Sequence, residues 1–229
     1  MKLRSNRMLS KILFFTVVCF LSLQVTAQEI TKDLGNFREV KTFNGIEVVI
    51  VPSNKNRIEI TGHSKEKVKF DIVQDRLEIR LSLDNIWSDD NTLIKVYGNA
   101  IETIDANEGS IVKTDGTLEG KMIILRAQEG ASVFAEVRAE SVKSKAISGG
   151  NITAEGKGDN QEAEVNTGGH FYGKSLKTKE AVVSVSTAGK AEVYATKYCK
   201  ATATLGGIIK IFGNPDEIDT KTSLGGKIL

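Results

Sequence analysis

The segment Ser144-Lys145-Ala146-Ile147-Ser148-Gly149-Gly150-Asn151-Ile152-Thr153-Ala154 contains the pattern that decides the fold. Small or apolar side chains stand at every second position on both sides of the glycine pair. A period of two residues indicates β-strands with one apolar face. The glycines mark a tight corner between two such strands.

The same pattern returns along the second half of the chain. The glycines that we take as equivalent corners are 18 to 21 residues apart: Gly109, Gly130, Gly150, Gly169, Gly189, Gly207 and Gly226. A coil of about 19 residues cannot bury its own apolar face, whereas coils stacked in register cover one another and share backbone hydrogen bonds. We therefore predict an all-β fold, a single-stranded right-handed parallel β-helix. The alternative is an antiparallel meander of hairpins with a similar spacing.

Positions counted from these glycines predict which side chains enter the core. Phe171 follows Gly169 by two residues and is expected to point inward. Phe134 follows Gly130 by four residues and is placed in the inward set by the same count. Lys113 and Ser132 interrupt this set in the first coils. Small residues before each corner and larger ones after it indicate two facing walls of a narrow core.

The N-terminus has the pattern of a cleaved signal peptide, which we assign to residues 1–27. Four basic residues precede an apolar run from Ile12 to Leu21, and the small residues Val25-Thr26-Ala27 follow as a cleavage site. The apolar run is too short to span a bilayer, so we expect cleavage rather than a membrane anchor. No second hydrophobic segment follows in the sequence, so the mature chain is not expected to have a transmembrane segment. The protein is therefore expected to be exported to the periplasm, the outer surface or the medium.

The mature chain is expected to be one β-helix domain over residues 37–229 after a flexible leader at 28–36. Within the domain, residues 37–105 are a less regular β region and residues 106–229 are the regular coils. The mature chain has 27 basic and 29 acidic residues and no basic stripe, so nucleic acid is not an expected partner. Its single cysteine, Cys199, is interpreted as a buried small apolar residue, with pairing between chains as the alternative.

Several segments resemble the head GIN domain family of autotransporter adhesins, which are exported bacterial proteins. The resemblance covers about residues 37–215. It rests on Phe43-Asn44-Gly45-Ile46-Glu47-Val48, on Leu77-Glu78-Ile79 and on the glycine ladder that follows. The family usually has Ser-Gly-Ser or Ser-Gly-Ala at the corners, where this chain has Glu108-Gly109-Ser110 and Glu129-Gly130-Ala131. The resemblance implies adhesion and brings no catalytic or binding residue.

No residue set predicts a catalytic site, a metal site or a bound cofactor. His63 and His170 have no cysteine or carboxylate at metal-ligand spacing. Glu108 and Glu129 occupy equivalent corners one coil apart, and glycosidases use two carboxylates roughly 5–10 Å apart. We interpret this pair as solvated turn charge. A polysaccharide-active enzyme on the same scaffold is the alternative that the pair leaves open.

Two sets of polar and aromatic residues are candidates for a ligand-binding face. The first is a ladder of small polar residues before the later corners, Asn166, Ser186, Thr204 and Ser223. It either stabilises the coils or binds a repetitive ligand such as a glycan. The second set is three tyrosines expected to face outward from adjacent coils, Tyr172, Tyr194 and Tyr198. Together they form our hypothesis for the binding face.

The function that these patterns favour is that of an exported, non-catalytic adhesion or surface-interaction protein. Its partner would be an unidentified surface ligand, either a polysaccharide or a protein. A third hypothesis is structural. The repeat still runs at Gly226, so an uncapped coil end would pair with another copy and form a homo-oligomer.

Overall fold

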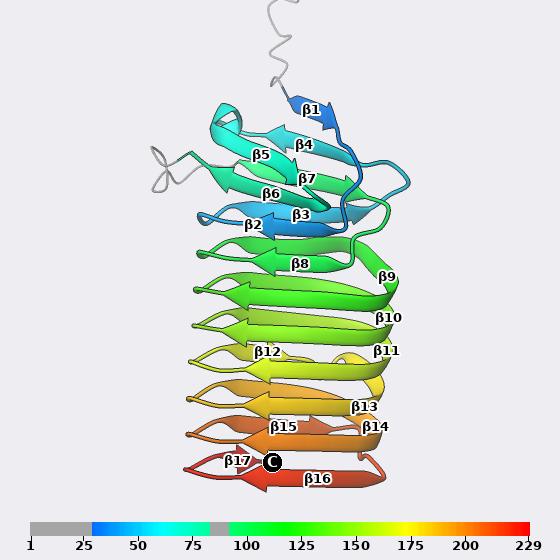
Figure 1. The fold of residues 1–229 in the computed structure, drawn as a ribbon, viewed down its shortest axis with the longest axis vertical. Coiled ribbons are helices and arrows are strands. Elements are labelled where there is room, and N and C mark those ends of the chain that lie inside the picture. Colours follow the sequence, from blue (N-terminus) through cyan, green and yellow to red (C-terminus); the bar gives the residue numbers. More distant parts are fainter. Residues whose placement is uncertain (1–28, 83–91) are drawn as a thin grey trace, which may run out of the picture.

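The computed structural model describes residues 29–82 and 92–229. They form a β-solenoid of stacked coils, which confirms the predicted fold (Figure 1). The expected signal peptide, residues 1–27, lies outside the described residues. None of the helical structure in the described part of the chain is long and apolar enough to cross a membrane.

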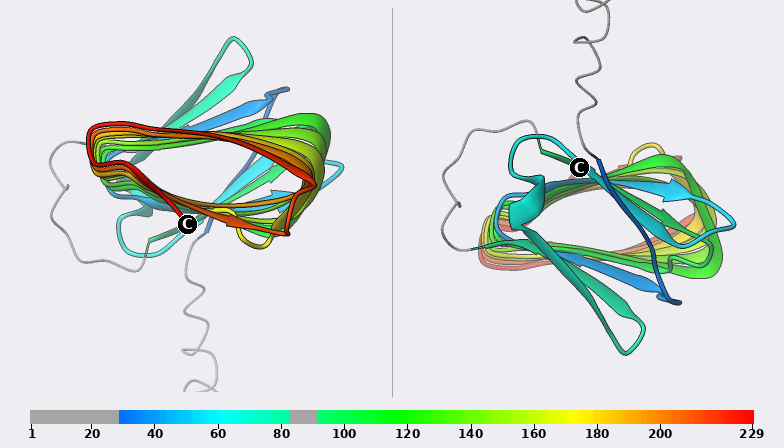
Figure 2. Two further views of the ribbon diagram at one scale, coloured as in Figure 1. Left: turned by 90° about the horizontal axis from the view of Figure 1, so that it is seen from below. Right: turned by 90° about the horizontal axis from the view of Figure 1, so that it is seen from above.

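Each coil contributes to two parallel sheets that face each other across a flattened oval, and the chain winds as a right-handed screw (Figures 1 and 2). We call the sheet that precedes each glycine corner the front sheet and the sheet that follows it the back sheet. Several strands are long enough to pass from the back sheet around the second bend into the front sheet. The strands of the regular coils are β9 (Ile111–Gln128), β10 (Ser132–Ile147), β11 (Asn151–Val165), β12 (His170–Tyr172), β13 (Leu176–Val185), β14 (Lys190–Ala203), β15 (Ile208–Phe212), β16 (Glu217–Thr222) and β17 (Lys227–Ile228).

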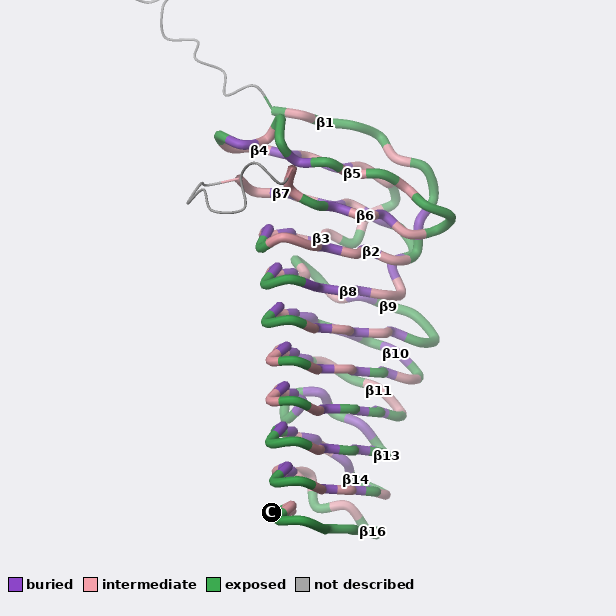
Figure 3. Tube along the Cα trace, turned by 60° about the vertical axis from the view of Figure 1, so that its left-hand side comes forward, coloured by how far each residue is buried: buried purple, intermediate pink, exposed green. Residues whose placement is uncertain are grey.

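Successive coils pair in parallel with equivalent residues side by side, so each inward position becomes a column. The back wall of the core is the fully buried column Val112, Val133, Ile152, Phe171, Ala191 and Ile209. The front wall carries smaller side chains, Ser144, Ala163, Val183 and Ala201. Burial alternates along β10, β11, β13 and most of β14 (Figure 3). Apolar surface buried between coils supplies the main stabilisation, on the order of 25 cal/mol per Å².

The front sheet passes to the back sheet through a tight turn in every coil. In the turn at Asn166 to Gly169, Thr167 and Gly168 both have positive φ, 48° and 72°, and the Gly169 N–H donates to the Asn166 carbonyl at 3.0 Å. Two consecutive residues of positive φ with this bond define a type I′ turn. The turns also bond to one another, because the Gly168 N–H donates to the Thr187 carbonyl of the next coil at 3.0 Å.

The turn register corrects the predicted alignment of glycines by one residue. Gly109 and Gly130 occupy the positive-φ position, whereas the later predicted corners, Gly150, Gly169, Gly189, Gly207 and Gly226, follow it by one residue. These later glycines are required by close packing instead. A Cβ on Gly150 would lie 2.0 Å from the Ala127 carbonyl oxygen.

The same shift changes the predicted direction of three side chains. Lys113, Ser132 and Phe134 point away from the core, because Val112 and Val133 occupy the inward column beside them. Phe134, expected inside, is 44% exposed. Phe171 is inward as predicted, with 1% of its surface exposed.

The N-terminal region closes the solenoid at one end with antiparallel strands. Its strands are β1 (Ile30–Asp33), β2 (Glu39–Thr42), β3 (Glu47–Pro52), β4 (Arg57–Thr61), β5 (Val68–Val73), β6 (Arg76–Leu81), β7 (Leu93–Gly98) and β8 (Thr103–Ala106), with a short 3₁₀ turn at Lys65–Lys67. Strands β2 and β3 form a coil that pairs directly with β8 and β9. The β5–β6 hairpin extends the front sheet, and β4 extends the back sheet. The expected flexible leader is wrong for residues 30–33, because β1 pairs with β4.

Replacing a positive-φ glycine and replacing a close-packed glycine by alanine should lower the unfolding free energy by different amounts. Gly168→Ala places a Cβ in open space at φ +72°, so we expect a loss of about 1–2 kcal/mol of unfolding free energy from backbone strain. Gly150→Ala drives a Cβ into the backbone of the neighbouring coil, so we expect a larger loss, on the order of 3 kcal/mol. Denaturant unfolding of the two variants measures the difference. Equal losses would contradict the assigned register.

Candidate functional site

The three candidate tyrosines do not share one face. Tyr172 in β12 and Tyr194 in β14 lie on the back sheet, where Tyr172 pairs with Glu192 and Tyr194 with Phe212. Tyr198 lies beyond the bend on the front sheet, beside Glu180 and Glu217. Partial burial and the nearby carboxylates of Asp219 and Glu217 raise the pKa of the Tyr198 hydroxyl. The hypothesis of a single tyrosine face therefore does not match the geometry.

The ring face of Tyr194 is covered by a lysine. Lys177 Nζ lies 3.7 Å from the centroid of the Tyr194 ring and donates to the Lys174 carbonyl at 3.0 Å. Lys174 Nζ lies 4.8 Å from the centroid of the Phe212 ring. These cation–π contacts brace the loop between β12 and β13 against the back sheet. They leave ammonium groups, rather than open aromatic faces, at this part of the surface.

A buried polar cluster supports Tyr194 from beneath. Gln161 Nε2 donates to the Thr178 hydroxyl at 2.8 Å and to the Tyr194 carbonyl at 2.6 Å. The Thr178 hydroxyl donates to the same carbonyl at 2.6 Å. The cluster satisfies backbone groups at the bend, where the β12–β13 loop interrupts the regular coil. It is structural and does not open to the surface.

The polar ladder lies along the narrow edge formed by the type I′ turns. Asn166, Ser186, Thr204 and Ser223 are each the first residue of a turn, and each backbone N–H donates to the neighbouring coil. The first three are half-buried. The ladder belongs to the turn edge, whereas Tyr172 and Tyr194 stand on the broad back sheet. The structure does not join the two predicted sets into one site.

Glu108 and Glu129 are neighbours in the turn column, as the spacing predicted. The Gly109 N–H donates to the Glu129 carbonyl at 3.0 Å, and Asn44 Nδ2 donates to a Glu108 carboxylate oxygen at 2.6 Å. Both glutamates have positive φ and are exposed at turn tips. Their placement on a convex edge offers no wall for holding a sugar between them.

A third carboxylate, that of Asp105, is buried near the same turn edge. Lys41 Nζ lies 3.2 Å from one carboxylate oxygen of Asp105, and Asn107 Nδ2 donates to the other at 3.1 Å. Gln128 joins the cluster through Asn107 Oδ1 at 2.8 Å. A buried charge that is paired and hydrogen-bonded in this way stabilises one coil register. Across residues 29–82 and 92–229, no group of three His, Cys, Asp or Glu side chains could hold a metal ion.

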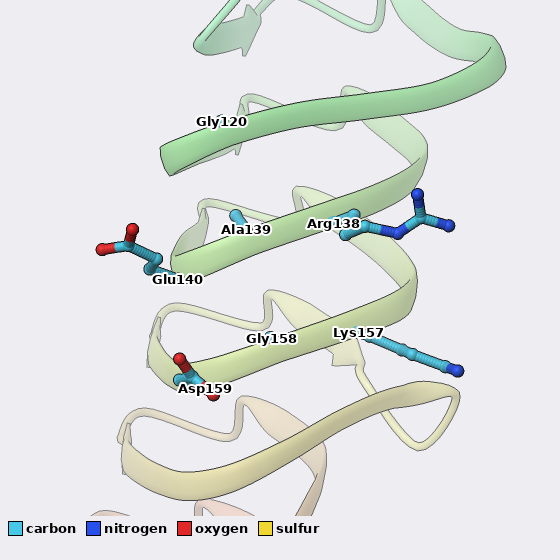
Figure 4. A pocket seen from close by; sticks show the side chains of 7 residues that line it. All are labelled: Gly120, Arg138, Ala139, Glu140, Lys157, Gly158 and Asp159. Atoms are coloured by element: carbon cyan, nitrogen blue, oxygen red, sulfur yellow. The ribbon is translucent and has the colours of Figure 1, made fainter.

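A shallow trough of about 380 Å³ runs along the second bend, over three stacked small residues, Gly120, Ala139 and Gly158 (Figure 4). Arg138 and Lys157 point to one side of it, and Glu140 and Asp159 to the other. Two of these charges are paired with other residues, Arg138 with Glu119 at 2.7 Å and Asp159 with Lys179 at 2.6 Å. The trough is an open surface on which cations and carboxylates lie on opposite sides, and two of the four charges are already paired.

The back sheet carries two exposed aromatic rings in one outward column. Phe134 of β10, Thr153 of β11 and Tyr172 of β12 are register partners in three successive coils. Phe134 is 44% exposed and Tyr172 is 45% exposed. We call these three residues the aromatic strip. The spacing from Gly130 had predicted that Phe134 points inward. Aligning Glu129-Gly130 with Ser148-Gly149 instead places Phe134 in the same outward column as Thr153 and Tyr172.

The side chains beside the aromatic strip are polar. Ser132, Asn151 and His170 form the adjacent outward column, and the His170 ring is stacked on Tyr172 with centroids 6.0 Å apart and planes 5° apart. Glu136 and Glu155 are exposed register partners on the other side of the strip. Exposed rings flanked by groups that donate and accept hydrogen bonds can stack on a sugar and bind its hydroxyls.

Cys199 is fully buried in the front wall of the core as a free thiol. Burial raises the pKa of the Cys199 thiol to about 11, because the thiolate cannot be solvated there. This location agrees with the interpretation of Cys199 as a small apolar residue. Pairing between chains would require the coil to open.

A family model described as "Putative auto-transporter adhesin, head GIN domain" matches residues 36–215. A "putative adhesin" from Bacteroides fragilis has a similar structure, with a TM-score of 0.78 and 15% identity over 89% of this chain and 97% of that chain. A "putative adhesin" from Parabacteroides distasonis gives 0.69 and 16% over 88% and 95%. A "putative lipid binding protein" from the same species gives 0.65 and 12% over 89% and 98%. At these identities the structures share the fold alone. No curated protein is similar in sequence.

The buried thiol makes a prediction about reactivity. In native protein at pH 8, we expect Cys199 to react with a thiolate-specific reagent about 100-fold more slowly than in urea-unfolded protein. A thiol with a pKa of about 11 has about a hundredth of the thiolate population of an ordinary thiol with a pKa of 9.0. Absorbance of the released chromophore measures both rates. Rapid labelling of the native protein would mean that the front wall opens readily.

Proposed function

The chain belongs to the head GIN domain family of auto-transporter adhesins, and from this premise we propose that it is exported and attaches to an extended surface ligand without catalysing a reaction. The match confirms the resemblance inferred from Phe43 to Val48 and from the glycine ladder. The aromatic strip is the observation that carries the proposal. It places two large apolar rings in water on a sheet whose core is already filled.

The shape of the back sheet supports attachment to an extended ligand. Stacked coils present the same outward position at regular intervals along the solenoid axis, which gives a long and nearly flat contact surface. Singly exposed apolar residues are common on proteins and need no function. Two aromatic rings in one column, bordered by hydrogen-bonding side chains, are a more specific arrangement.

The arrangement of carboxylates supports a non-catalytic role. Hydrolysis of a glycosidic bond requires two carboxyl groups that converge on a bound sugar. Glu108 and Glu129 stand on an exposed turn edge, and the Asp105 carboxylate is held by Lys41 and Asn107. None of these three groups lies at the trough or at the aromatic strip. The carboxylates that border the strip, Glu136 and Glu155, are register partners on the same side of it, and Asp159 at the trough is paired with Lys179 at 2.6 Å.

Self-association is a second candidate function, favoured by one strand. All six residues of β16 are exposed, and its outer edge is unpaired within the described chain. Ile218, which occupies an inward column, is 51% exposed there. An uncovered strand edge can pair with a strand of another copy. A monomer by light scattering at high concentration would count against this candidate.

The test of the proposed function is a binding assay on purified residues 28–229. The protein is incubated with immobilised polysaccharides, with phospholipid vesicles and with whole bacterial cells, and both retention and release of reducing ends are measured. We expect retention on a polysaccharide or on cells without release of ends. We also expect the variant Glu108→Gln with Glu129→Gln to be retained as well as the wild type. Release of ends that this variant abolishes would instead identify a polysaccharide-active enzyme.

A further inference from the structure

We propose that the aromatic strip of Phe134, Thr153 and Tyr172 binds a neutral polysaccharide chain that lies along the solenoid axis. The inference rests on the proposed attachment function and specifies the class and direction of the ligand. It also replaces the predicted face of three tyrosines, because Tyr198 is on the opposite sheet and Tyr194 is covered by Lys177.

The distance between the Phe134 and Tyr172 rings indicates which class of polysaccharide the strip would bind. Phe134 and Tyr172 lie in one column with a single strand between them, so they are two strand spacings apart, roughly 9.5 Å. In an extended β-1,4-linked polysaccharide with two-fold symmetry, every second sugar turns the same ring face to the same side. The disaccharide repeat of such a chain is close to the separation of the two rings. Each ring can therefore stack on an equivalent sugar.

The middle of the aromatic strip leaves room for the intervening sugar. Thr153 carries a short side chain that is half-buried, so the surface between the two rings is lower than the rings themselves. The stacked His170 ring limits the motion of Tyr172, which lowers the entropy lost when a sugar binds. The aromatic strip therefore has a shallow depression at Thr153 between the rings of Phe134 and Tyr172.

The polar columns on both sides match the hydroxyl groups at the edges of a sugar chain. Asn151 and His170 provide donors and acceptors along one edge. Glu136 and Glu155 provide carboxylate acceptors along the other. Glu136 already accepts a hydrogen bond from the Thr117 hydroxyl at 2.7 Å through one oxygen, which orients its carboxylate.

The charges around the aromatic strip select a neutral chain over an anionic one. Two carboxylates, Glu136 and Glu155, border the strip as exposed register partners. Two lysines in the column of the strip are engaged elsewhere, with Lys113 Nζ 2.6 Å from Glu47 and Lys210 Nζ 3.7 Å from Glu192. Lys190, the register partner of His170, is the exposed cation of the adjacent column. A polysaccharide of uronic acids would bring its own carboxylates toward this acidic border. Repulsion between like charges disfavours such a chain.

Affinity electrophoresis of the mature protein tests the proposal, with hydroxyethylcellulose and β-1,4-mannan as neutral probes and polygalacturonate as the anionic probe. We expect retardation by at least one neutral probe and not by polygalacturonate. Phe134→Ala with Tyr172→Ala should weaken that binding about tenfold or more, because both stacking contacts are lost. The matched control is Tyr198→Ala on the front sheet, which should bind as the wild type does.

A second variant tests the spacing rather than the mere presence of aromatic rings. Thr153→Tyr combined with Tyr172→Ala keeps two rings in the same column but halves their separation. We expect this variant to bind the neutral probe as weakly as the double alanine variant does. Wild-type affinity would contradict the match to a disaccharide repeat. Circular dichroism and thermal unfolding establish that all variants remain folded, as expected for outward positions.

The outcomes separate this inference from the proposed function. If the wild type binds a neutral probe and the double alanine variant binds equally well, the strip is not the site, although attachment stands. If the wild type binds only polygalacturonate, only vesicles or only cells, the ligand class is wrong and the proposed attachment must be mapped elsewhere. If the protein is retained by none of these surfaces, both the inference and the proposed function fail.

Discussion

Hydrogen bonds between equivalent residues of successive coils hold the solenoid together, and they continue without interruption through the turns. In seven consecutive contacts, the N–H at the third turn position donates to a carbonyl at the second turn position of the next coil, at 2.8–3.1 Å. This geometry requires two adjacent residues of positive φ in each turn. Glycine occupies the second of these positions in every turn except that of Ala188. The turn edge can then stay in register from the first coil to the last, while register shifts occur away from it, as between Phe134 and Glu136 in the pairing of β10 with β9.

Strict register has a consequence at the N-terminal end, where one coil has no preceding coil to cover it. The chain solves this by leaving the solenoid after β3 and returning through β4 to β7 before it resumes at β8. The antiparallel strands β1 and β5 then form the outermost edges of the back and front sheets. The edge that would invite pairing with another chain is thereby covered by short and twisted strands.

Register also makes the surface a set of columns in which neighbouring side chains come from different coils. Opposite charges use this directly, as Lys143 and Glu162 lie 3.0 Å apart and Lys145 and Glu164 lie 3.1 Å apart. Exposed pairs of this kind contribute little individually, about 0–1 kcal/mol. The same columns can present chemically similar groups at a fixed interval, which is the property that a binding surface for a repeating polymer needs.

Repeat length, strand periodicity, the all-β class and the family could all be predicted from the sequence, because they depend on local pattern. The sequence also placed Phe171 inside and Tyr172 outside. It could not determine the register between the Glu-Gly corners and the Gly-Gly corners, since a glycine chosen for positive φ and a glycine chosen for lack of a Cβ look identical in sequence. That one-residue ambiguity sent Phe134 to the wrong face. Which side chains share a sheet depends on the packing of the coils. Tyr194 and Tyr198 are only a few positions apart, yet a bend separates them, and the position of that bend is set by contacts between coils.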